Sequence, residues 1–482
     1  MTKPQDKYDV IIIGAGMGGL ACGTYMAKEG MKVLMCEQHS VPGGYCTSFK
    51  REGFNFEASL HWLNGCGEGG WIYQVLEELE LKDKIEFIQL DPVRRIIGKG
   101  YDLTMFSDTQ RLEKELSQMF PAEKEGIHRF IADCITLVDK TSEAIMLYMG
   151  KSYGQVIDSL FKDAKLKLIL YSLASPSWSA IFPMFQVGWL SHQDYYFPKR
   201  GGARVLAYLF SDAFQMYGGE LRLGKMVSKV LIESGKASGI ELAGGEQIKS
   251  GCVVSNADAR LTFLKLVGRE FLTDDFINAL LETKICPPGF LVSLGVDLDL
   301  KRMGFGGEMI TYNPAQSLEE CSTTDPQRSS ITFIIYSLRD PSLAPPRKHA
   351  MGILAVLPYD HMNNWGVEKD GGRGKQYHEL KQKVADELIA SAENVIPGLS
   401  QHIVCRDVAT PLTYERYTLN TRGSMMGWIL SPGDTASLSL MGSRTPIKNL
   451  FQAGHWTMPG GGVLPTILSG KNAAELILEG KK

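Results

Sequence analysis

The stretch Asp9-Val-Ile-Ile-Ile-Gly-Ala-Gly-Met-Gly-Gly-Leu20 decides the fold expected for this chain. Its apolar, β-branched run has the length of a buried parallel strand. The glycines that follow have the spacing G-x-G-x-x-G. A helix expected over residues 20–29 and a second strand over 31–36 complete a βαβ unit. This context, rather than the glycines alone, predicts a dinucleotide-binding domain.

Each glycine of this unit, and the acid that ends it, has its own expected role. Gly14 permits the tight turn from strand to helix, and Gly16 lets backbone N–H groups approach a pyrophosphate at the helix N-terminus. Gly19 lets the helix and the strand pack closely. Glu37 ends the second strand, at the spacing of an acid that hydrogen-bonds a ribose diol. Glu37 also disfavours NADP, because its charge would repel a 2′-phosphate.

The composition is that of an ordinary globular protein. The chain has 482 residues, of which 44% are hydrophobic and 22% charged, and its net charge is −3. Two or three domains are therefore expected, and no nucleic-acid partner is indicated. The nine cysteines are scattered without a C-x-x-C pair, which favours reduced, buried thiols, no metal site and a cytoplasmic location. The polar N-terminus predicts no signal peptide.

One uncharged stretch, residues 168–190, complicates this interpretation. It is long enough to span a bilayer, but Pro176 and Pro183 interrupt it, so we do not expect a transmembrane helix. One interpretation is a buried part of a helical subdomain. The other is the lining of an apolar channel or a surface that dips into a membrane. We favour the second, and peripheral membrane contact is therefore expected.

The remaining chain divides by pattern. Short strands are expected within residues 85–106 and helices across most of 108–200. A helix over 203–216 precedes a β-meander. The meander is expected to comprise strands at 227–232, 238–242 and 247–248 and a return strand at 252–255. Strands are also expected at 290–298, 330–337 and 352–357, with a helix over 377–395. The predicted domains are an FAD-binding domain in three parts (1–75, 199–265 and 446–482), a helical and substrate subdomain (76–198) and a mixed-sheet substrate domain (266–445).

The C-terminal tail returns to the cofactor. A strand over 449–454 ends at glycine, and Pro459-Gly-Gly-Gly-Val463 precedes a final helix expected over 468–478. Glycines before a helix expose N–H groups at its positive end, where they would stabilise a reduced flavin. A meander and return strand after a βαβ unit are how FAD is usually housed. The predicted cofactor-binding residues are Gly14, Gly16, Met17, Gly18, Gly19, Glu37, Gly43, Gly44, Tyr45, Val227, Gly454, Gly461, Gly462 and Val463.

These motifs together resemble one family, the FAD-dependent phytoene desaturase, carotenoid isomerase and retinol saturase-like oxidoreductases. The resemblance covers nearly the whole chain. It is carried by the N-terminal unit with Pro42-Gly-Gly44, by Tyr196-Phe-Pro-Lys-Arg-Gly-Gly202, by Val254-Ser-Asn-Ala-Asp258, by Asp340-Pro-Ser-Leu-Ala-Pro-Pro346 and by Ala453-Gly-His-Trp-Thr-Met-Pro-Gly-Gly-Gly462. It implies an α/β fold: a Rossmann-like FAD-binding domain of the glutathione-reductase and amine-oxidase type, an α+β substrate domain and a helical lid.

One segment favours a subgroup of this family. Gly53-Phe-Asn-Phe-Glu-Ala-Ser-Leu-His-Trp-Leu-Asn-Gly65 resembles a retinol saturase pattern. The resemblance implies an oxidoreductase that acts on carbon–carbon double bonds of a long apolar polyene or isoprenoid, by hydride exchange with flavin N5. NAD(P)H or a quinone is the implied electron partner. Two positions depart from the family: Tyr45 replaces a common Arg, and His455 replaces a common acid.

His61 and His455 are the candidate catalytic residues, because each lies in a segment expected to line the flavin. Hydrogen bonding to the flavin and general acid catalysis are the expected roles, and a structural histidine is the alternative. Other functions of the same fold stay open: a phytoene-type desaturase, a flavin amine oxidase, or a non-catalytic prenyl or lipid carrier. The glycine set and Glu37 argue against a carrier, which needs no pyrophosphate cradle. The oligomeric state stays open.

Overall fold

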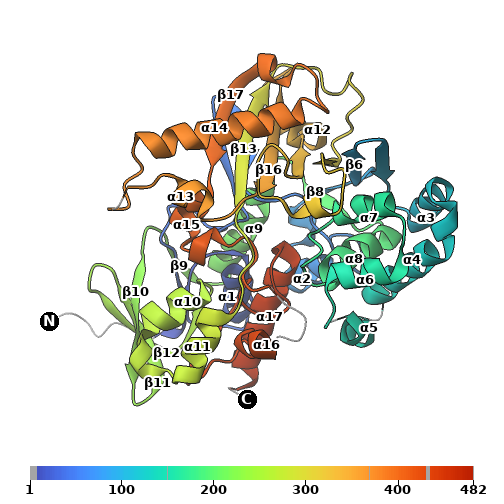
Figure 1. Cartoon of the computed structure of the whole chain (residues 1–482). Helices are drawn as coiled ribbons and strands as arrows, with labels where there is room; N and C mark the ends of the chain where they lie inside the picture. The colour runs from blue at the N-terminus through green and yellow to red at the C-terminus, as the bar shows by residue number, and fades with distance from the viewer. Residues whose placement is uncertain (1–7, 140, 149, 369, 430–434, 481–482) are drawn as a thin grey trace.

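The structure is a computed structural model of the chain, and it describes residues 8–480 except 140, 149, 369 and 430–434. Three parts are visible in Figure 1. A parallel sheet with its helices holds both ends of the chain, a second sheet lies above it, and a group of short helices lies to one side. The site described below lies where these parts meet.

A parallel sheet in the order β18-β12-β1-β2-β9 forms the core of the first part. Its strands are β1 (Tyr8–Ile13), β2 (Val33–Cys36), β9 (Glu220–Arg222), β12 (Gln247–Ser255) and β18 (Leu450–Gln452). The β-branched residues of β1 suit a central strand covered on both faces. Ile13 lies beside Cys36 and Ser255, so the carboxyl ends of these strands share one edge. The loops that follow β1 and β18, which carry both glycine motifs, therefore meet there.

The helices α1 (Met17–Lys28), α9 (Ala203–Met216) and α17 (Val463–Glu479) pack together beside this sheet. A Cβ on Gly470 would lie 2.2 Å from the carbonyl oxygen of Gly18, so α1 and α17 pack in close contact. Both helices begin earlier than predicted, at Met17 and Val463. The early start of α17 includes Pro465 in its first turn, where a residue without an N–H is tolerated.

The β-meander consists of β10 (Val227–Glu233), β11 (Lys236–Leu242) and the first half of β12. The prediction of separate strands at 247–248 and 252–255 was wrong, because β12 is one continuous strand. Its first half pairs antiparallel with β11 and its second half parallel with β1. Alternate residues of the polar stretch, Ile248, Ser250 and Cys252, are buried, which keeps the strand regular through Gly251.

The second sheet has the order β17-β13-β16-β15-β14-β6-β7. Its strands are β6 (Arg94–Gly98), β7 (Tyr101–Met105), β13 (Gly289–Val296), β14 (Met309–Asn313), β15 (Ile331–Ile334), β16 (His349–Val356) and β17 (Ile403–Ala409). The strands β14 and β17 were not predicted, and the strand predicted over 330–337 ends at Ile334, before α12 (Tyr336–Arg339). The strands β6 and β7 lie where short strands were expected, within residues 85–106, and they belong to the second sheet.

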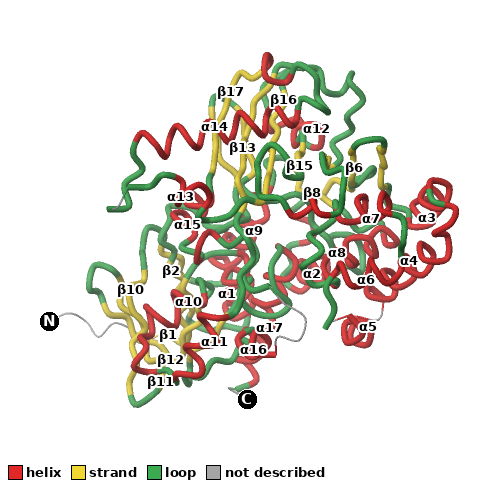
Figure 2. Tube along the Cα trace, viewed as in Figure 1, coloured by secondary structure: helices red, strands yellow, loops and turns green. Residues whose placement is uncertain are grey.

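The two faces of this sheet have different neighbours. Figure 2 shows α14 (Lys375–Ala392) crossing the sheet, and Phe290 and Val292 of β13 form a cluster with Leu388 of that helix. Side chains alternate along a strand, so Leu291 points to the opposite face, toward the parallel-sheet part. That face forms one wall of the site.

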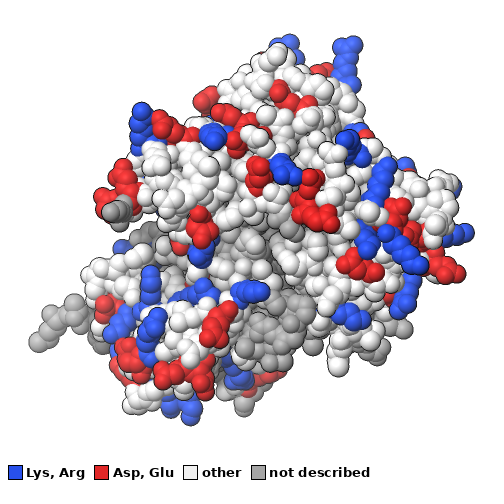
Figure 3. Space-filling view, in the orientation of Figure 1, with Lys and Arg blue, Asp and Glu red and all other residues white. Residues whose placement is uncertain are grey.

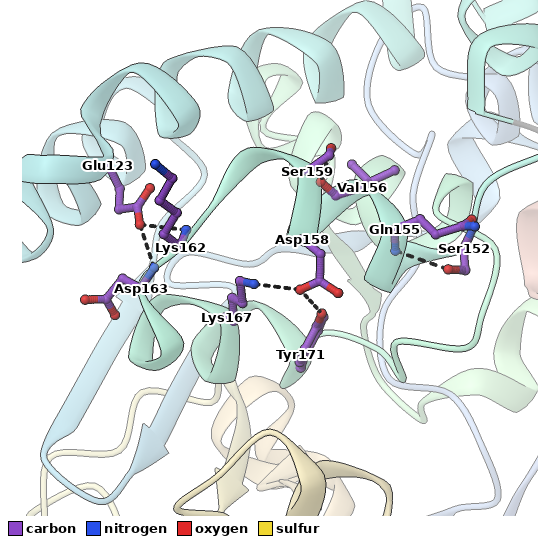
Figure 4. Close-up of polar contacts among 10 residues, drawn as sticks. All are labelled: Glu123, Ser152, Gln155, Val156, Asp158, Ser159, Lys162, Asp163, Lys167 and Tyr171. Carbon is purple, nitrogen blue, oxygen red and sulfur yellow. Dashed lines mark hydrogen bonds and ion pairs between the residues drawn. The ribbon is translucent and has the colours of Figure 1, made fainter.

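The helical part comprises α3 (Thr109–Met119), α4 (Lys124–Asp139), α5 (Thr141–Tyr148), α6 (Tyr153–Leu160), α7 (Ala164–Tyr171) and α8 (Ile181–Gly188). Polar contacts fix the connection between α6 and α7 (Figure 4). Glu123 accepts hydrogen bonds from the backbone N–H groups of Lys162 and Asp163 at 2.8 and 2.6 Å. Asp158 of α6 pairs with Lys167 of α7 at 2.8 Å. These contacts hold the two short helices together.

The uncharged stretch 168–190 lies inside this helical part. It runs from α7 through a turn to α8, and only Ser177 within it is exposed. Several of its aromatic side chains, including Trp178 and Phe185, line the cavity described below. The stretch is thus both part of the helical group and part of the cavity wall. Among the residues that the structure describes, no helix combines the length and the apolar composition that a membrane span requires.

Shorter elements connect these parts. They are α2 (Trp71–Glu78), α10 (Ala259–Leu261), α11 (Asp274–Glu282), α13 (His361–Trp365), α15 (Pro411–Thr418) and α16 (Thr435–Leu440), with strands β3 (Ser48–Arg51), β4 (Phe54–Glu57), β5 (Phe87–Gln89) and β8 (Tyr196–Pro198). On the face shown in Figure 3, basic and acidic side chains intermingle. That face presents no strongly basic surface of the kind that nucleic acids need.

Candidate active site

A cavity of about 860 Å³ lies where the three parts of the fold meet. Such a volume is in the range of cofactor and ligand sites. The cavity brings together nearly all of the predicted site residues, which come from five separate segments of the chain. Those that line it are Gly14, Gly16, Met17, Gly18, Glu37, Gly43, Gly44, Tyr45, His61, Val227, Gly454, His455, Gly461, Gly462 and Val463. Gly19 does not line it: a Cβ there would lie 2.3 Å from the carbonyl oxygen of Gly14, which agrees with the packing role predicted for it.

The start of α1 forms an open cradle at one end of this cavity. Gly16 is the N-cap of α1 and has an extended backbone. The N–H of Gly43 donates to the carbonyl oxygen of Ala15 at 2.8 Å. This hydrogen bond holds Gly43 and Gly44 beside the glycines at the start of α1. A Cβ on Gly44 would lie 3.4 Å from the Cα of Gly16. The cradle thus exposes backbone at a helix N-terminus, where anionic groups bind.

Glu37 lies at the edge of this cradle and is only 8% exposed. Its Oε2 accepts a hydrogen bond from the N–H of Ala15 at 2.8 Å, and its Oε1 accepts one from the N–H of His39 at 2.9 Å. Each carboxylate oxygen keeps further acceptor capacity. The carboxylate is therefore held in place by backbone donors and can still accept hydrogen bonds from a ribose.

Asn256 lies among the glycines and was not predicted as a site residue. Its Nδ2 donates to the carbonyl oxygen of Gly14 at 3.3 Å. A Cβ on Gly16, Gly18 or Gly454 would approach the Asn256 side chain to between 2.5 and 2.8 Å. Asn256 thus spaces the two glycine motifs. Its position directly after β12, in the motif that carried part of the resemblance, was the signal that could have identified it.

The second glycine motif lies beside the start of α1, where a Cβ on Gly18 would come within 2.7 Å of the Gly454 backbone. Gly454 has a φ of +98°, in the region that favours glycine. Gly462 is the N-cap of α17, so the glycine run directly precedes the first turn of that helix. A Cβ on Gly461 would lie 2.3 Å from the Cβ of Met426. Close packing on one side and the cavity on the other explain why this run lacks side chains.

His455 belongs to a buried polar cluster next to this motif. Asn420 Oδ1 accepts a hydrogen bond from His455 Nε2 at 3.2 Å and another from Trp456 Nε1 at 2.9 Å. Because an amide oxygen only accepts, the imidazole carries its proton on Nε2. Burial lowers the pKa of His455 to about 4. The imidazole is therefore neutral near pH 7, with Nδ1 left as an acceptor.

Tyr45 packs beside His455, with ring centroids 6.0 Å apart, and beside Tyr414 at 5.8 Å. Its hydroxyl donates to the carbonyl oxygen of Ser424 at 2.9 Å. Burial raises the pKa of Tyr45 well above its usual value, so the phenol stays protonated. Tyr45 thus lines the cavity with an aromatic face and uses its polar end to hold the 420–424 segment.

His61 also lines the cavity. Its carbonyl oxygen accepts a hydrogen bond from Arg339 Nη1, and its ring is tilted against Trp62 at 5.9 Å. Burial, with the nearby charges of Arg339 and Arg94, lowers the pKa of His61 to about 3. This imidazole is also neutral near pH 7, which favours a hydrogen-bonding role over that of an imidazolium acid.

A buried acid, Glu57, binds the N-terminus of α9. Both carboxylate oxygens of Glu57 accept hydrogen bonds from the N–H of Ala203, at 3.1 and 3.2 Å, at the start of α9. Gly202 has a φ of +71°, and a Cβ there would overlap Glu57. Burial raises the pKa of Glu57 to about 8. The carboxyl group therefore titrates near neutral pH rather than in the acid range.

The remaining wall of the cavity is apolar and aromatic. The helical part contributes Leu173, Trp178, Ile181, Phe182, Phe185 and Trp189. Cys46 also lines the cavity. Burial raises the pKa of its thiol and of the Cys66 thiol, which follows the cavity-lining Gly65. Such thiols are not activated nucleophiles. The cavity thus joins a glycine cradle for an anionic cofactor to a wall suited to a hydrocarbon chain.

A family model described as an NAD(P)-binding Rossmann-like domain matches residues 12–79, which hold the first glycine motif. Similarity to named proteins extends much further. A chloroplastic prolycopene isomerase of Daucus carota is 27% identical over 98% of this chain and 81% of its own length. Over nearly its whole length the chain is similar to named carotenoid and retinol enzymes. A Methylomonas 4,4′-diapophytoene desaturase is 25% identical over 97% of this chain and 94% of its length, and a Danio rerio all-trans-retinol 13,14-reductase 22% identical over 94% and 83%.

Solved structures establish the fold independently. An oxidoreductase of Methanosarcina mazei superposes with a TM-score of 0.68 at 18% identity, covering 97% of this chain and all of its own. Putrescine oxidase superposes with a TM-score of 0.70 at 14% identity, covering 99% of this chain and all of its own. The predictions of the fold class, of the family resemblance and of an oxidoreductase are confirmed. The matching family model describes a domain that binds a nucleotide cofactor.

Proposed function

We propose that the chain is an FAD-dependent oxidoreductase that acts on carbon–carbon double bonds of a long apolar polyene or isoprenoid. One observation carries this proposal: the glycine cradle and the aromatic wall line the same cavity. The relatives support it, because their names include a prolycopene isomerase, a retinol reductase and a diapophytoene desaturase. A carrier of the same fold would need only the apolar half of the cavity.

The residues present fit FAD. Glu37, held by two backbone donors, would bind the adenosine ribose, and the Gly16 region at the start of α1 would bind the pyrophosphate. The N-terminus of α17, preceded by Gly461 and Gly462, would face the flavin ring. Bound FAD would supply hydride exchange between its N5 and a substrate carbon, with NAD(P)H or a quinone as the second electron partner.

The chain's own side chains would position the substrate and exclude water. Trp178, Phe182 and Phe185 line the cavity with hydrocarbon surface, which suits an apolar chain and keeps the reacting carbon dry. His61 and His455 are neutral near pH 7 because burial lowers the pKa of both. We therefore assign them hydrogen-bonding roles toward the cofactor or substrate, rather than that of a charged proton donor.

We propose a peripheral membrane contact at α5, from which an apolar substrate would enter. Met146 and Leu147 on α5 are 76% and 66% exposed, whereas the preceding Ile145 lines the cavity. Exposed apolar side chains on a helix suit the interface of a bilayer. Flotation with vesicles of phosphatidylcholine tests this: wild type should float with the vesicles, and the Met146→Ser/Leu147→Ser double variant should not. Flotation of both proteins to the same extent would contradict the contact.

An anaerobic experiment tests the proposed function. The cofactor is first released by denaturation and identified as FAD by chromatography; a protein that neither carries nor takes up FAD would exclude the proposal. The FAD-loaded protein is then reduced and mixed with retinol or a carotene in detergent. Flavin reoxidation with a polyene band moving to shorter wavelength indicates a saturase. If the flavin stays reduced and only the cis/trans pattern of the polyene changes, the protein is an isomerase.

Two further outcomes separate the alternatives. If the oxidised protein converts a less unsaturated substrate into a product that absorbs at longer wavelength, the protein is a desaturase. Peroxide formed only when an amine is added indicates an amine oxidase and contradicts the polyene proposal.

A further inference from the structure

Arg94 is a buried cation in the wall of the cavity. It begins β6, pairs in register with Met309 of β14, and is 6% exposed. Both residues line the cavity. Along β6, Ile96 faces the same side as Arg94 and belongs to the core of the parallel-sheet and helical parts, whereas Ile97 packs with the α14 side. The alternation of the strand thus turns Arg94 toward the cavity and Arg95 away from it.

The guanidinium of Arg94 is under-satisfied. Nη1 has no hydrogen-bond partner among the described residues, and Nη2 contacts only the sulfur of Met309, at 3.8 Å. The ring of Trp62 also lies close, with its centroid 5.6 Å from the guanidinium carbon. Arg95, in contrast, forms two bonds to Asp102 at 2.8 and 2.6 Å. A buried charge without partners is destabilising unless something binds it.

Among the described residues, no acid is paired with Arg94. The carboxylate of Asp194 accepts a hydrogen bond from the backbone N–H of Gly65 at 2.5 Å. Glu308, close to the adjacent buried Arg339, accepts one from the N–H of Gly306 at 2.8 Å. Burial lowers the pKa of Arg94 only to about 10, so the side chain keeps its charge near pH 7. The cavity therefore offers an anion site within a largely apolar wall.

We propose that Arg94 binds a carboxylate at one end of the polyene substrate, an inference that rests on the proposed function. A guanidinium matches a carboxylate in shape and can donate two parallel hydrogen bonds to it. Of the two buried arginines near His61, Arg94 lines the cavity and Arg339 does not. The single guanidinium of Arg94 balances the single charge of a carboxylate. A phosphate or diphosphate end would leave additional negative charge uncompensated in this apolar surrounding. The substrate class is thus a polyene acid, anchored at Arg94 with its hydrocarbon chain along the aromatic wall.

Equilibrium binding to the FAD-loaded protein tests this. Retinoic acid and its methyl ester have the same polyene, but only the acid carries a charge. Quenching of tryptophan fluorescence reports binding, because Trp62 adjoins Arg94. We expect wild type to bind the acid about 10- to 100-fold more tightly than the ester. Arg94→Met should abolish this preference and leave ester affinity within about threefold of wild type.

Two controls keep the result interpretable. Arg95→Met removes the neighbouring charge on the opposite face of β6 and should bind both ligands as wild type does. Arg94→Lys keeps the charge and should retain part of the preference for the acid. Arg94→Met should fold and hold FAD normally, because an apolar side chain replaces an uncompensated buried charge; its FAD absorbance and unfolding temperature check this.

Several outcomes would overturn the inference. A wild type that binds acid and ester equally, or an Arg94→Met variant that keeps the preference, contradicts carboxylate binding at Arg94. Loss of FAD from Arg94→Met would place Arg94 on the cofactor instead. If the protein binds geranylgeranyl diphosphate in an Arg94-dependent way but does not bind retinoic acid, the ligand of Arg94 is a phosphate group and not a carboxylate. These outcomes concern Arg94 alone. If the wild-type protein holds FAD and converts a neutral polyene, the proposed function stands in each case.

Discussion

Substitution of Gly16 by valine separates cofactor binding from folding. Gly16 has φ −73° and ψ 171°, a conformation open to any residue. A Cβ there would meet only Nδ2 of Asn256, at 2.8 Å, the far end of a side chain that can move. We therefore expect the apoprotein to lose only about 1 kcal/mol of unfolding free energy, the low end of overpacking effects. The valine side chain would occupy the space that the pyrophosphate needs.

The size of the cofactor effect follows from linkage. A ligand at 100 times its dissociation constant stabilises the native state by about 2.7 kcal/mol. Wild-type apoprotein should gain this amount when FAD is added at that concentration. Gly16→Val should gain nothing at the same FAD concentration, although its apoprotein is nearly as stable as wild type.

Denaturant unfolding of both apoproteins, with and without FAD, measures these quantities. Gly244→Val is the matched control, because no atom lies within 4 Å of a Cβ at Gly244; it should gain as much from FAD as wild type. Gly18→Val is the contrast, because its Cβ would lie 2.7 Å from the backbone of Gly454, and its apoprotein should be the less stable. If Gly16→Val gains the full 2.7 kcal/mol, the pyrophosphate does not lie at the start of α1.

Three further substitutions probe the polar groups around the site. Glu37→Gln replaces one acceptor by a donor, so we expect a loss of about 1–3 kcal/mol of unfolding free energy and weaker FAD binding by titration; unchanged values of both would contradict the ribose assignment. Because the pKa of Glu57 is raised in the folded state, wild-type stability should fall as the pH rises from about 4.5 to about 8, by up to about 1.4 kcal/mol per pH unit. Glu57→Gln should remove that part of the slope in denaturant unfolding, and parallel curves would refute it. Asn420→Ala leaves donors of His455 and Trp456 without an acceptor and should lower the unfolding free energy by about 2–4 kcal/mol; a loss below 0.5 kcal/mol, on the order of a surface substitution, would argue against this cluster.

Much of the cofactor site could be predicted from the sequence because its requirements are local. A strand, a turn with glycine at 14 and 16, a helix and a terminal acid are all specified within residues 8–37. A backbone that must come close to a ligand, or adopt positive φ as Gly454 does, selects glycine directly. The helix of residues 203–216 was likewise predicted to the residue, from apolar spacing between glycine signals.

Other features depended on contacts between distant segments. Local polarity suggested a break at 249–251, but β12 stays one strand because β11, β1 and β18 all pair with it. The strands β14 and β17 escaped prediction because their pairing partners lie far away in the sequence.

The sequence by itself determined the βαβ unit, the two glycine motifs and the family resemblance, since these depend on backbone freedom and on periodicity within short segments. Only the tertiary structure decided that Asn256 spaces the two motifs, that Asn420 fixes the proton of His455, and that Arg94 faces the cavity. The physical reason is that hydrogen bonding and desolvation act through space. A side chain's partner, its burial and its charge state are set by segments that only the folded chain brings together.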